Sequence, residues 1–365
     1  MNALAYYKAL HQIPEPSEKE FETSKYIFDA LESIGYNPTV VGDTGVFADL
    51  ISDENLPWIL LRADIDALPI NENSGLPYSS KHAGVMHACG HDSHSAMLLE
   101  TAKNLFSKKL PHNVRFLFQP AEETTTGALK IIDKVIPKNL IACFAMHVWP
   151  QVPFGLAVTK SGALMASSDF AKIKFYGKSS HCSQQEKGNN ALLSAVDMVS
   201  AFPNVNQIAT NDEAMLFCGS IHSGAAHNIV PDFAEIYATI RTYSSEHRNN
   251  TKKQLQIVAD EIASKYSTRA QIDYEGGCPP VCNDEKIVKI LTNNIFNVSD
   301  TASPTLAGED FACFSEYAPS CMIWLGIGDT PPLHNEKFFV PNEVLPIGVE
   351  LWNKIANFNW EEELS

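Results

Sequence analysis

Residues 58–66 have the sequence Trp-Ile-Leu-Leu-Arg-Ala-Asp-Ile-Asp, in which an apolar run leads directly into two acidic side chains. An apolar run this short is typical of a strand that is buried on both faces of a sheet. Similar runs occur at residues 114–118, 141–146 and 321–325. We therefore expect these four segments to be central strands of one sheet.

Helical patterns lie between these runs. Apolar residues recur at helical spacing from Ser17 to the residue before Gly35, and further helices are expected at 93–107 and 127–136. Strands that alternate with helices predict an α/β fold, here a mixed, largely parallel sheet with helices on both faces.

The stretch 166–276 has a different order of elements, which is β-α-β-β-α-β. The expected elements are strand 169–176, helix 188–202, strands 214–222 and 229–242, helix 246–266 and strand 270–274. This order is that of a ferredoxin-like α+β domain. With hinges near Gly162 and Gly276, the sequence predicts a larger domain of residues 1–162 and 277–365, with a smaller domain of residues 163–276 inserted into it.

The composition is that of an ordinary globular protein. With 45% hydrophobic and 19% charged residues, the 365-residue chain is long enough for two domains. Its formal net charge of −16 would repel a polyanion, which argues against nucleic-acid binding. We find neither the roughly 18 consecutive apolar residues of a membrane helix nor a signal-peptide pattern. The eight cysteines are therefore expected to be reduced thiols in a cytoplasmic protein.

Residues able to bind metals or move protons follow each of the four expected strands. They are Asp64 and Asp66, Glu122 and Glu123, His147 and, after a loop, His334. Because ligands bind beyond the carboxyl ends of the strands in an open α/β sheet, we expect these side chains to share one site.

The segment 86–94, Met-His-Ala-Cys-Gly-His-Asp-Ser-His, has the densest set of such residues. Cys89 and His91 are two residues apart in an expected loop with a glycine between them, so both side chains can turn toward one point. Thiolate, imidazole and carboxylate are the ligands of zinc-like cations. A lone Cys or His is more often a buried thiol or a capped imidazole, but this pair beside strand-end acids favours a metal site. Asp92 or Ser93 is expected to cap the helix that follows.

Glu122 and Glu123 allow two interpretations. Two acids ahead of a helix that begins near Gly127 can simply complement the helix dipole. Beside a metal site, one carboxylate can instead bind the cation while the other takes the proton from the metal-bound water.

Seven motifs run in one order across almost the whole chain. They are residues 62–69 (Arg-Ala-Asp-Ile-Asp-Ala-Leu-Pro), 86–92 (Met-His-Ala-Cys-Gly-His-Asp), 118–123 (Phe-Gln-Pro-Ala-Glu-Glu), 147–150 (His-Val-Trp-Pro), 227–232 (His-Asn-Ile-Val-Pro-Asp), 308–311 (Gly-Glu-Asp-Phe) and 332–335 (Pro-Leu-His-Asn). In these motifs the chain resembles the carboxypeptidase–aminoacylase group of metallopeptidases and amidohydrolases. The resemblance is to the branch with hippurate hydrolase, N-acyl-amino-acid amidohydrolase, N-acetyldiaminopimelate deacetylase and the indoleacetyl-amino-acid hydrolases.

The resemblance implies two divalent metal ions per chain. It implies five ligands for them, which are Cys89, His91, Glu123, His147 and His334. It further implies that Glu122 is the general base and that Asp64 or Asp66 holds a ligand in its orientation. A mixed thiolate, imidazole and carboxylate set accepts Zn²⁺ or Mn²⁺, and also Co²⁺ or Ni²⁺.

In the inserted domain, the resemblance implies that His181 donates to the oxyanion of the tetrahedral intermediate, often across a dimer. It implies that Asn228 and Arg241 bind the substrate's carboxylate, a role that suits the planar guanidinium of an arginine. It also implies that His227 lies in the same substrate pocket. Without the resemblance, His181 is a polar residue at a strand end and Arg241 lies on a solvated strand face. The inserted domain is thus expected to be a lid and to form a homodimer.

The expected function is hydrolysis of the amide bond of an N-acyl amino acid, with an acetyl or aromatic acyl group, or of a short peptide with a free carboxylate. One alternative is a non-catalytic, metal-dependent binding protein on the same fold, against which Glu122 and the complete ligand set argue. Another is a thiol hydrolase with Cys89 as nucleophile. The pair Gln185-Glu186 stands where many relatives have Pro-His, so the substrate preference of hippurate hydrolases does not carry over.

Overall fold

The computed structural model describes residues 1–211, 213–295 and 297–364. Contacts within the chain divide it into two compact units. The first unit contains Met1–Leu164, Val281–Ser303 and Asp310–Ser365, and the second contains Met165–Pro280 and Pro304–Glu309. The return of Pro304–Glu309 to the second unit has no counterpart in the division expected from the sequence.

The first unit contains a mixed sheet with strand order β1-β2-β4-β3-β5-β16-β6-β15. Its strands are β1 (Thr39–Val41), β2 (Gly45–Leu50), β3 (Trp58–Asp64), β4 (Asn113–Gln119), β5 (Leu140–Trp149), β6 (Ala157–Val158), β15 (Val298–Ser299) and β16 (Ser320–Gly326). The four predicted apolar runs form β3, β4, β5 and β16, which lie side by side and parallel at the centre. The predicted α/β class, with a mixed and largely parallel sheet, is confirmed.

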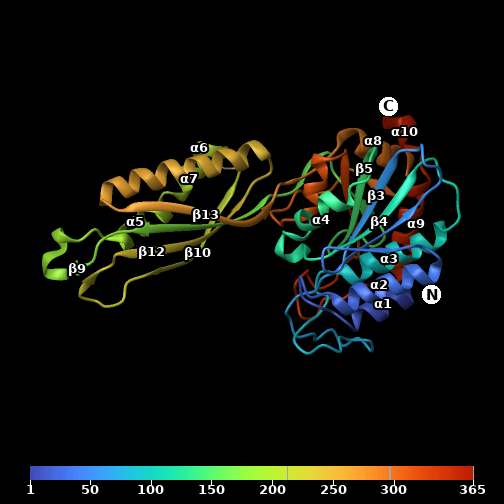
Figure 1. Cartoon of the computed structure of the whole chain (residues 1–365), viewed down its shortest axis with the longest axis horizontal. Helices are drawn as coiled ribbons and strands as arrows, with labels where there is room; N and C mark the ends of the chain where they lie inside the picture. The colour runs from blue at the N-terminus through green and yellow to red at the C-terminus, as the bar shows by residue number, and fades with distance from the viewer. Residues whose placement is uncertain (212, 296, 365) are drawn as a thin grey trace. The chain divides into compact units, whose positions relative to one another are not determined.

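Helices cover both faces of this sheet (Figure 1). The helices of the first unit are α1 (Ala3–His11), α2 (Phe21–Ile34), α3 (His91–Leu105), α4 (Gly127–Val135), α8 (Glu285–Asn294), α9 (Leu345–Asn357) and α10 (Trp360–Leu364). Ile59 and Leu61 of β3 belong to one core with residues of α1, α3 and α9, whereas the intervening Leu60 is buried outside that core. Because side chains alternate along a strand, both faces of β3 are therefore covered.

Two helix starts differ from the predictions. Helix α2 begins at Phe21 rather than Ser17, because the hydroxyl of Ser17 donates to Asp66 Oδ2 at 2.7 Å and Glu18 is in the left-handed region, with φ of 68°. Helix α3 begins at His91, so His91 is not in the loop. Its N-cap is Gly90, and neither Asp92 nor Ser93 caps it.

The second unit contains the antiparallel sheet β10-β12-β8-β13. Its main elements are β8 (Ser168–Tyr176), α5 (Ala191–Ser200), α6 (Phe202–Thr210), β10 (Met215–Ser223), β12 (Phe233–Arg241), α7 (Ser245–Tyr266) and β13 (Arg269–Cys278). This strand order is that of the predicted ferredoxin-like arrangement. The single helix predicted over 188–202 is wrong at both ends, because α5 begins only at Ala191 and ends at Ser200. Helix α6 begins two residues later, with Pro203 in its first turn.

The remaining elements are short. They are η1 (Glu122–Thr124), β7 (Gly162–Met165), β9 (Ser180–His181), η2 (Cys182–Lys187), β11 (Ile229–Val230), β14 (Val281–Asn283), η3 (Asp310–Glu316) and η4 (Asn342–Val344). Among the described helices, none combines the length and the apolar character that a membrane crossing requires.

Candidate metal centre

The five predicted metal ligands converge at the carboxyl end of the parallel strands. Cys89 Sγ lies 3.4 Å from His147 Nε2, and His334 Nε2 lies 3.4 Å from Glu123 Oε1. His91 Nε2 lies 3.9 Å from the same Glu123 oxygen. The sets Cys89–His91–His147 and Cys89–Glu123–His334 each hold their ligand atoms within 4.8 Å of one another. Residues 245 positions apart in the chain thus meet at one point because strands β4, β5 and β16 end there.

Gly90 lets Cys89 and His91 face the same point. It has φ of 87°, and a Cβ at this position would lie 2.5 Å from Val148 Cγ2. Any other residue would need an unfavourable backbone conformation and a shift of the Val148 side chain, so the position between Cys89 and His91 requires glycine.

Hydrogen bonds at the Nδ1 atoms orient the rings of His91 and His147. His91 Nδ1 lies 3.0 Å from the backbone oxygen of Asp66 and 3.1 Å from its Oδ1, and His147 Nδ1 lies 2.6 Å from the backbone oxygen of Val148. Each Nδ1 therefore carries the proton, which leaves the Nε2 lone pair for a cation. His91 Nε2 is buried and has no hydrogen-bond partner among the described residues, which fits a metal ligand.

The charges around the cluster favour a cation. Burial by itself lowers the pKa of His91, but Asp64 and Asp66 outweigh this effect and raise the pKa to about 10. Burial, together with the charges of Glu123 and Glu122, raises the pKa of the Cys89 thiol well above its usual value. A thiolate at this place therefore needs a bound metal ion to stabilise it.

Glu122 lies beside Glu123 and approaches the same nitrogen of His91. Its side chain is buried, and its Oε2 lies 3.9 Å from His91 Nε2. Glu122 and Glu123 both belong to the single turn η1, so the two carboxylates enter the site from the same backbone segment.

Several buried partners of this site were missed by the sequence analysis. Arg62 Nη1 donates to Asp64 Oδ2 at 2.6 Å, and Arg62 Nη2 donates to Asp310 Oδ1 at 3.1 Å. His94 Nδ1 lies 2.6 Å from Asp64 Oδ1. The sequence contained two signals for these contacts: an arginine within an apolar strand needs a buried anion, and His94 is one helical turn after His91.

A second missed cluster surrounds His11 at the end of α1. Its Nδ1 lies 2.5 Å from Asp92 Oδ2 and its Nε2 lies 3.2 Å from Glu72 Oε1. Burial opposes protonation of His11, but the two carboxylates prevail and raise its pKa to about 9. The pKa of Glu72 is lowered to about 2, because its hydrogen bonds from His11 and Ser74 outweigh its burial.

This cluster predicts a pH-dependent stability. Because the pKa of His11 is higher in the folded chain than the ordinary value of 6.5, its stabilising effect is complete below pH 6.5 and is lost as the pH rises through about 9. We expect this loss to be about 3 kcal/mol of unfolding free energy. It can be measured as the melting temperature of the metal-loaded protein between pH 6 and 10. His11→Gln should flatten the curve in that range, and an unchanged slope would contradict the assignment.

The predicted substrate residues belong to the second unit. His181 is exposed at the start of η2, and its strand β9 pairs with β11, where Asn228 accepts the N–H of Cys182 at 2.9 Å. His227, next in the chain, is also exposed. Arg241 ends β12 beside the start of β8, whereas His181 follows the end of β8. The structure thus brings His181 and Asn228 together and leaves Arg241 at the opposite end of the sheet.

Arg241 has an unusual environment for an arginine. Burial lowers its pKa, and its guanidinium lies 5.7 Å from the centre of the Phe170 ring. Within the described part of the chain it forms no ion pair with a carboxylate.

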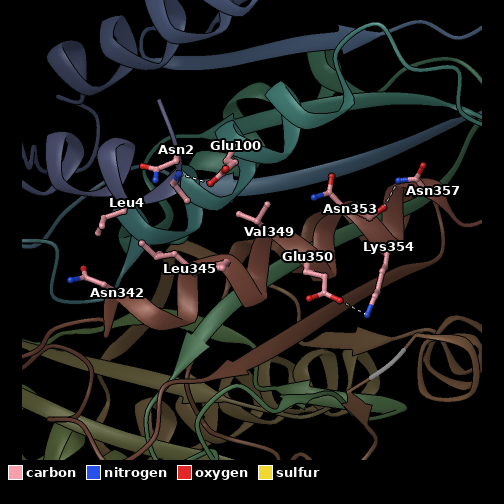
Figure 2. A pocket seen from close by; sticks show the side chains of 12 residues that line it. Asn2, Leu4, Glu100, Asn342, Leu345, Val349, Glu350, Asn353, Lys354 and Asn357 are labelled. Atoms are coloured by element: carbon pink, nitrogen blue, oxygen red, sulfur yellow. Dashed lines mark hydrogen bonds and ion pairs between the residues drawn. The ribbon is translucent and has the colours of Figure 1, made fainter.

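A separate groove of about 570 Å³ lies between α1, α3 and α9. Figure 2 shows Glu100, Asn353 and the ion-paired Glu350 and Lys354 on its walls. None of the predicted site residues lines this groove, so it does not form part of the metal centre.

The fold and the converging side chains define the class of the protein, a two-unit α/β chain with a largely buried site for divalent cations. Comparison with known proteins then identifies the family. The sequence model of Peptidase family M20/M25/M40 matches residues 60–357, and the chain belongs to this family.

Relatives and solved structures match over nearly the whole chain. N-acetyl-L-cysteine deacetylase of Bacillus subtilis is 38% identical over 91% of this chain and 82% of its own length. N-acetyldiaminopimelate deacetylase of Ligilactobacillus salivarius is 30% identical over 98% of this chain and 96% of its own. The crystal structure of the Bacillus subtilis YXEP protein, described as a dinuclear metal binding peptidase of this family, has 32% identity, a TM-score of 0.85 and 98% coverage of both chains.

Proposed function

We propose that this protein is a metal-dependent amidohydrolase that hydrolyses the amide bond of an N-acyl amino acid, or of a short peptide, with a free carboxylate. The observation that carries the proposal is the convergence of Cys89, His91, Glu123, His147 and His334 around one point, with Glu122 beside them. The deacetylase activity of the two relatives supports acetyl groups as the acyl part.

Two divalent ions, Zn²⁺ or Mn²⁺, are proposed to occupy the ligand set. Cys89 and Glu123 each belong to two of the groups of side chains that could hold a cation. This sharing, and the similarity to a dinuclear metal binding peptidase, support two ions rather than one. When bound, such ions polarise the amide carbonyl and make water a better nucleophile. Co²⁺ and Ni²⁺ fit the same ligands.

The chain's own residues supply the proton transfers. Glu122 accepts a proton from the attacking water and delivers it to the leaving amine. Asp66 holds the His91 ring through Nδ1, and Asp64 holds His94. The raised pKa of Cys89 disfavours the alternative of a thiol nucleophile, because that reaction needs a thiolate in the absence of metal.

Arg241 and Asn228 are proposed to bind the substrate's carboxylate, with His227 beside them, and His181 is proposed to stabilise the oxyanion. The separation of His181 from Arg241 within one unit supports a homodimer in which the two residues serve the same site from different protomers. The exposed edge strand β10 offers a surface for such pairing. A cytoplasmic location is supported by the free thiols of Cys89, Cys143, Cys182, Cys218 and Cys321.

The test is a substrate panel of N-acetyl and N-benzoyl amino acids, dipeptides and the matching amino-acid amides that lack a carboxylate. We expect hydrolysis to vanish on chelation, to return with Zn²⁺ or Mn²⁺, and to be much weaker for the amides. Turnover that resists chelation would refute the metal mechanism. Metal binding without turnover of any substrate would favour the alternative of a binding protein.

A further inference from the structure

The turn that presents Glu122 and Glu123 has a backbone conformation that needs support. Ala121 and Thr125, on either side of η1, have φ of 55° and 54°, a region that residues with a Cβ disfavour. A cavity of about 240 Å³ lies against this turn and is lined by Thr44, Pro120, Ala121 and Lys130, among others. Hydrogen bonds from neighbouring segments help to hold the turn in this conformation.

Glu20 provides one of these hydrogen bonds. Its side chain is 0% exposed, and its Oε1 accepts the backbone N–H of Ala121 at 2.9 Å. The same oxygen accepts the N–H of Glu18 at 2.9 Å, and Oε2 accepts the hydroxyl of Thr44 at 2.7 Å. Among the described residues no cation forms an ion pair with Glu20. Donors from three segments, rather than a cation, therefore hold this buried carboxylate.

The segment before Glu20 supports the other side of the same turn. The hydroxyl of Ser17 donates to Asp66 Oδ2 at 2.7 Å, and this oxygen also accepts the backbone N–H of Glu123 at 3.0 Å. The N–H of Ala67 donates to the carbonyl of Glu15 at 2.8 Å. The connection between α1 and α2 therefore supports η1 at two points. Glu20 binds the N–H of Ala121 directly, and Ser17 binds Asp66, which in turn binds the N–H of Glu123.

We propose that Glu20 is a positioning residue for the carboxylate pair Glu122 and Glu123. By fixing the backbone at Ala121, it sets the direction in which both side chains leave η1. The proposal rests on the proposed function, because it takes Glu122 as the base and Glu123 as a ligand. A displacement of about 1 Å in a catalytic group can cost about 100-fold in rate, so a contact outside the site can control turnover.

The test compares Glu20→Ala with Glu20→Gln. In the alanine variant we expect kcat to fall by about 10- to 100-fold while KM changes by less than about threefold. Its Zn²⁺ affinity, measured by competition with a chelator, should fall by about tenfold. Glutamine can still accept both N–H groups and can donate to the hydroxyl of Thr44. Its kcat and Zn²⁺ affinity should therefore be within about threefold of the wild type.

Asn113→Ala is a matched control. Asn113 is also fully buried, at the opposite end of β4, where its Oδ1 accepts the N–H of Ser52 at 2.8 Å. This variant should lose stability but keep kcat and Zn²⁺ affinity. If Glu20→Ala does not fold, Thr44→Val removes one donor to Glu20 and should lower kcat by about two- to fivefold.

Three results would overturn the proposal. They are wild-type kcat and Zn²⁺ affinity in Glu20→Ala, equal defects in Glu20→Ala and Glu20→Gln, or a loss of kcat in Asn113→Ala as large as in Glu20→Ala. A failure of the proposed function is distinct from these, because the wild type would then hydrolyse no substrate of the panel. In that case the Zn²⁺ affinities of the same variants still decide whether Glu20 positions the turn.

Discussion

Glu122→Gln is expected to lower kcat by about 10²- to 10⁴-fold while the bound metal is retained. The amide has nearly the shape of the carboxylate, but it cannot accept a proton from the attacking water or return it to the leaving amine. Glu122 Oε2 lies 3.9 Å from His91 Nε2, close enough to take a proton from a water molecule beside the proposed ligands. All five proposed ligands are unchanged in this variant. The measurements are kcat with an N-acetyl amino acid and elemental analysis of the purified variant.

Glu123→Gln is the matched control for this experiment, since it changes the neighbouring residue of the same turn. It should lose both metal and activity, because Glu123 Oε1 contacts His334 and His91. If Glu122→Gln lost its metal to the same extent, or kept its full activity, the division of labour between the two carboxylates would be wrong.

Cys89→Ala is expected to have the second large effect, the loss of both metal ions and of hydrolysis. Cys89 belongs to the ligand group with His91 and His147 and also to the group with Glu123 and His334. Removing partners outside a ligand set costs about 10- to 100-fold in metal affinity, and a ligand shared by two groups should cost more. The melting temperature should also lose its increase on addition of Zn²⁺, because ligand binding stabilises the folded state.

Cys143→Ala is the control for removing a buried thiol. Cys143 lies in β5, the strand that carries His147, and is completely buried. Burial raises the pKa of its thiol above the usual range, and it belongs to none of the ligand groups within the described residues. Activity and metal content should therefore be retained. Full metal occupancy in Cys89→Ala would show that the thiol is not a ligand.

The central strands and the convergence of the proposed ligands could be predicted because their signals are local. Each apolar run is followed by polar residues, and the carboxyl ends of parallel strands lie at one edge of a sheet. His334 is an example, since it follows β16 by a loop and still reaches Glu123. The roles of the residues in the second unit remain predictions, because they depend on how a substrate is bound.

The supporting contacts could not be predicted because their partners are distant in the sequence. His11 contacts Asp92 across 81 residues, and Glu20 contacts Ala121 across 101. Nothing near Ser17 shows that its hydroxyl binds Asp66 instead of capping a helix, so the start of α2 was predicted four residues too early. At these positions, hydrogen bonds to residues distant in the sequence determine the conformation, and the local sequence pattern does not.

The order of the strands has a consequence for the synthesis of the protein. Strand β16 lies between β5 and β6, although it is made more than 150 residues after both of them. A chain still emerging from the ribosome therefore lacks a central strand of its sheet until residues 320–326 arrive, and the last of the proposed ligands, His334, follows only then. The nascent protein consequently has an incomplete sheet and an incomplete set of proposed ligands until translation is almost finished, and strand edges exposed during that time favour aggregation.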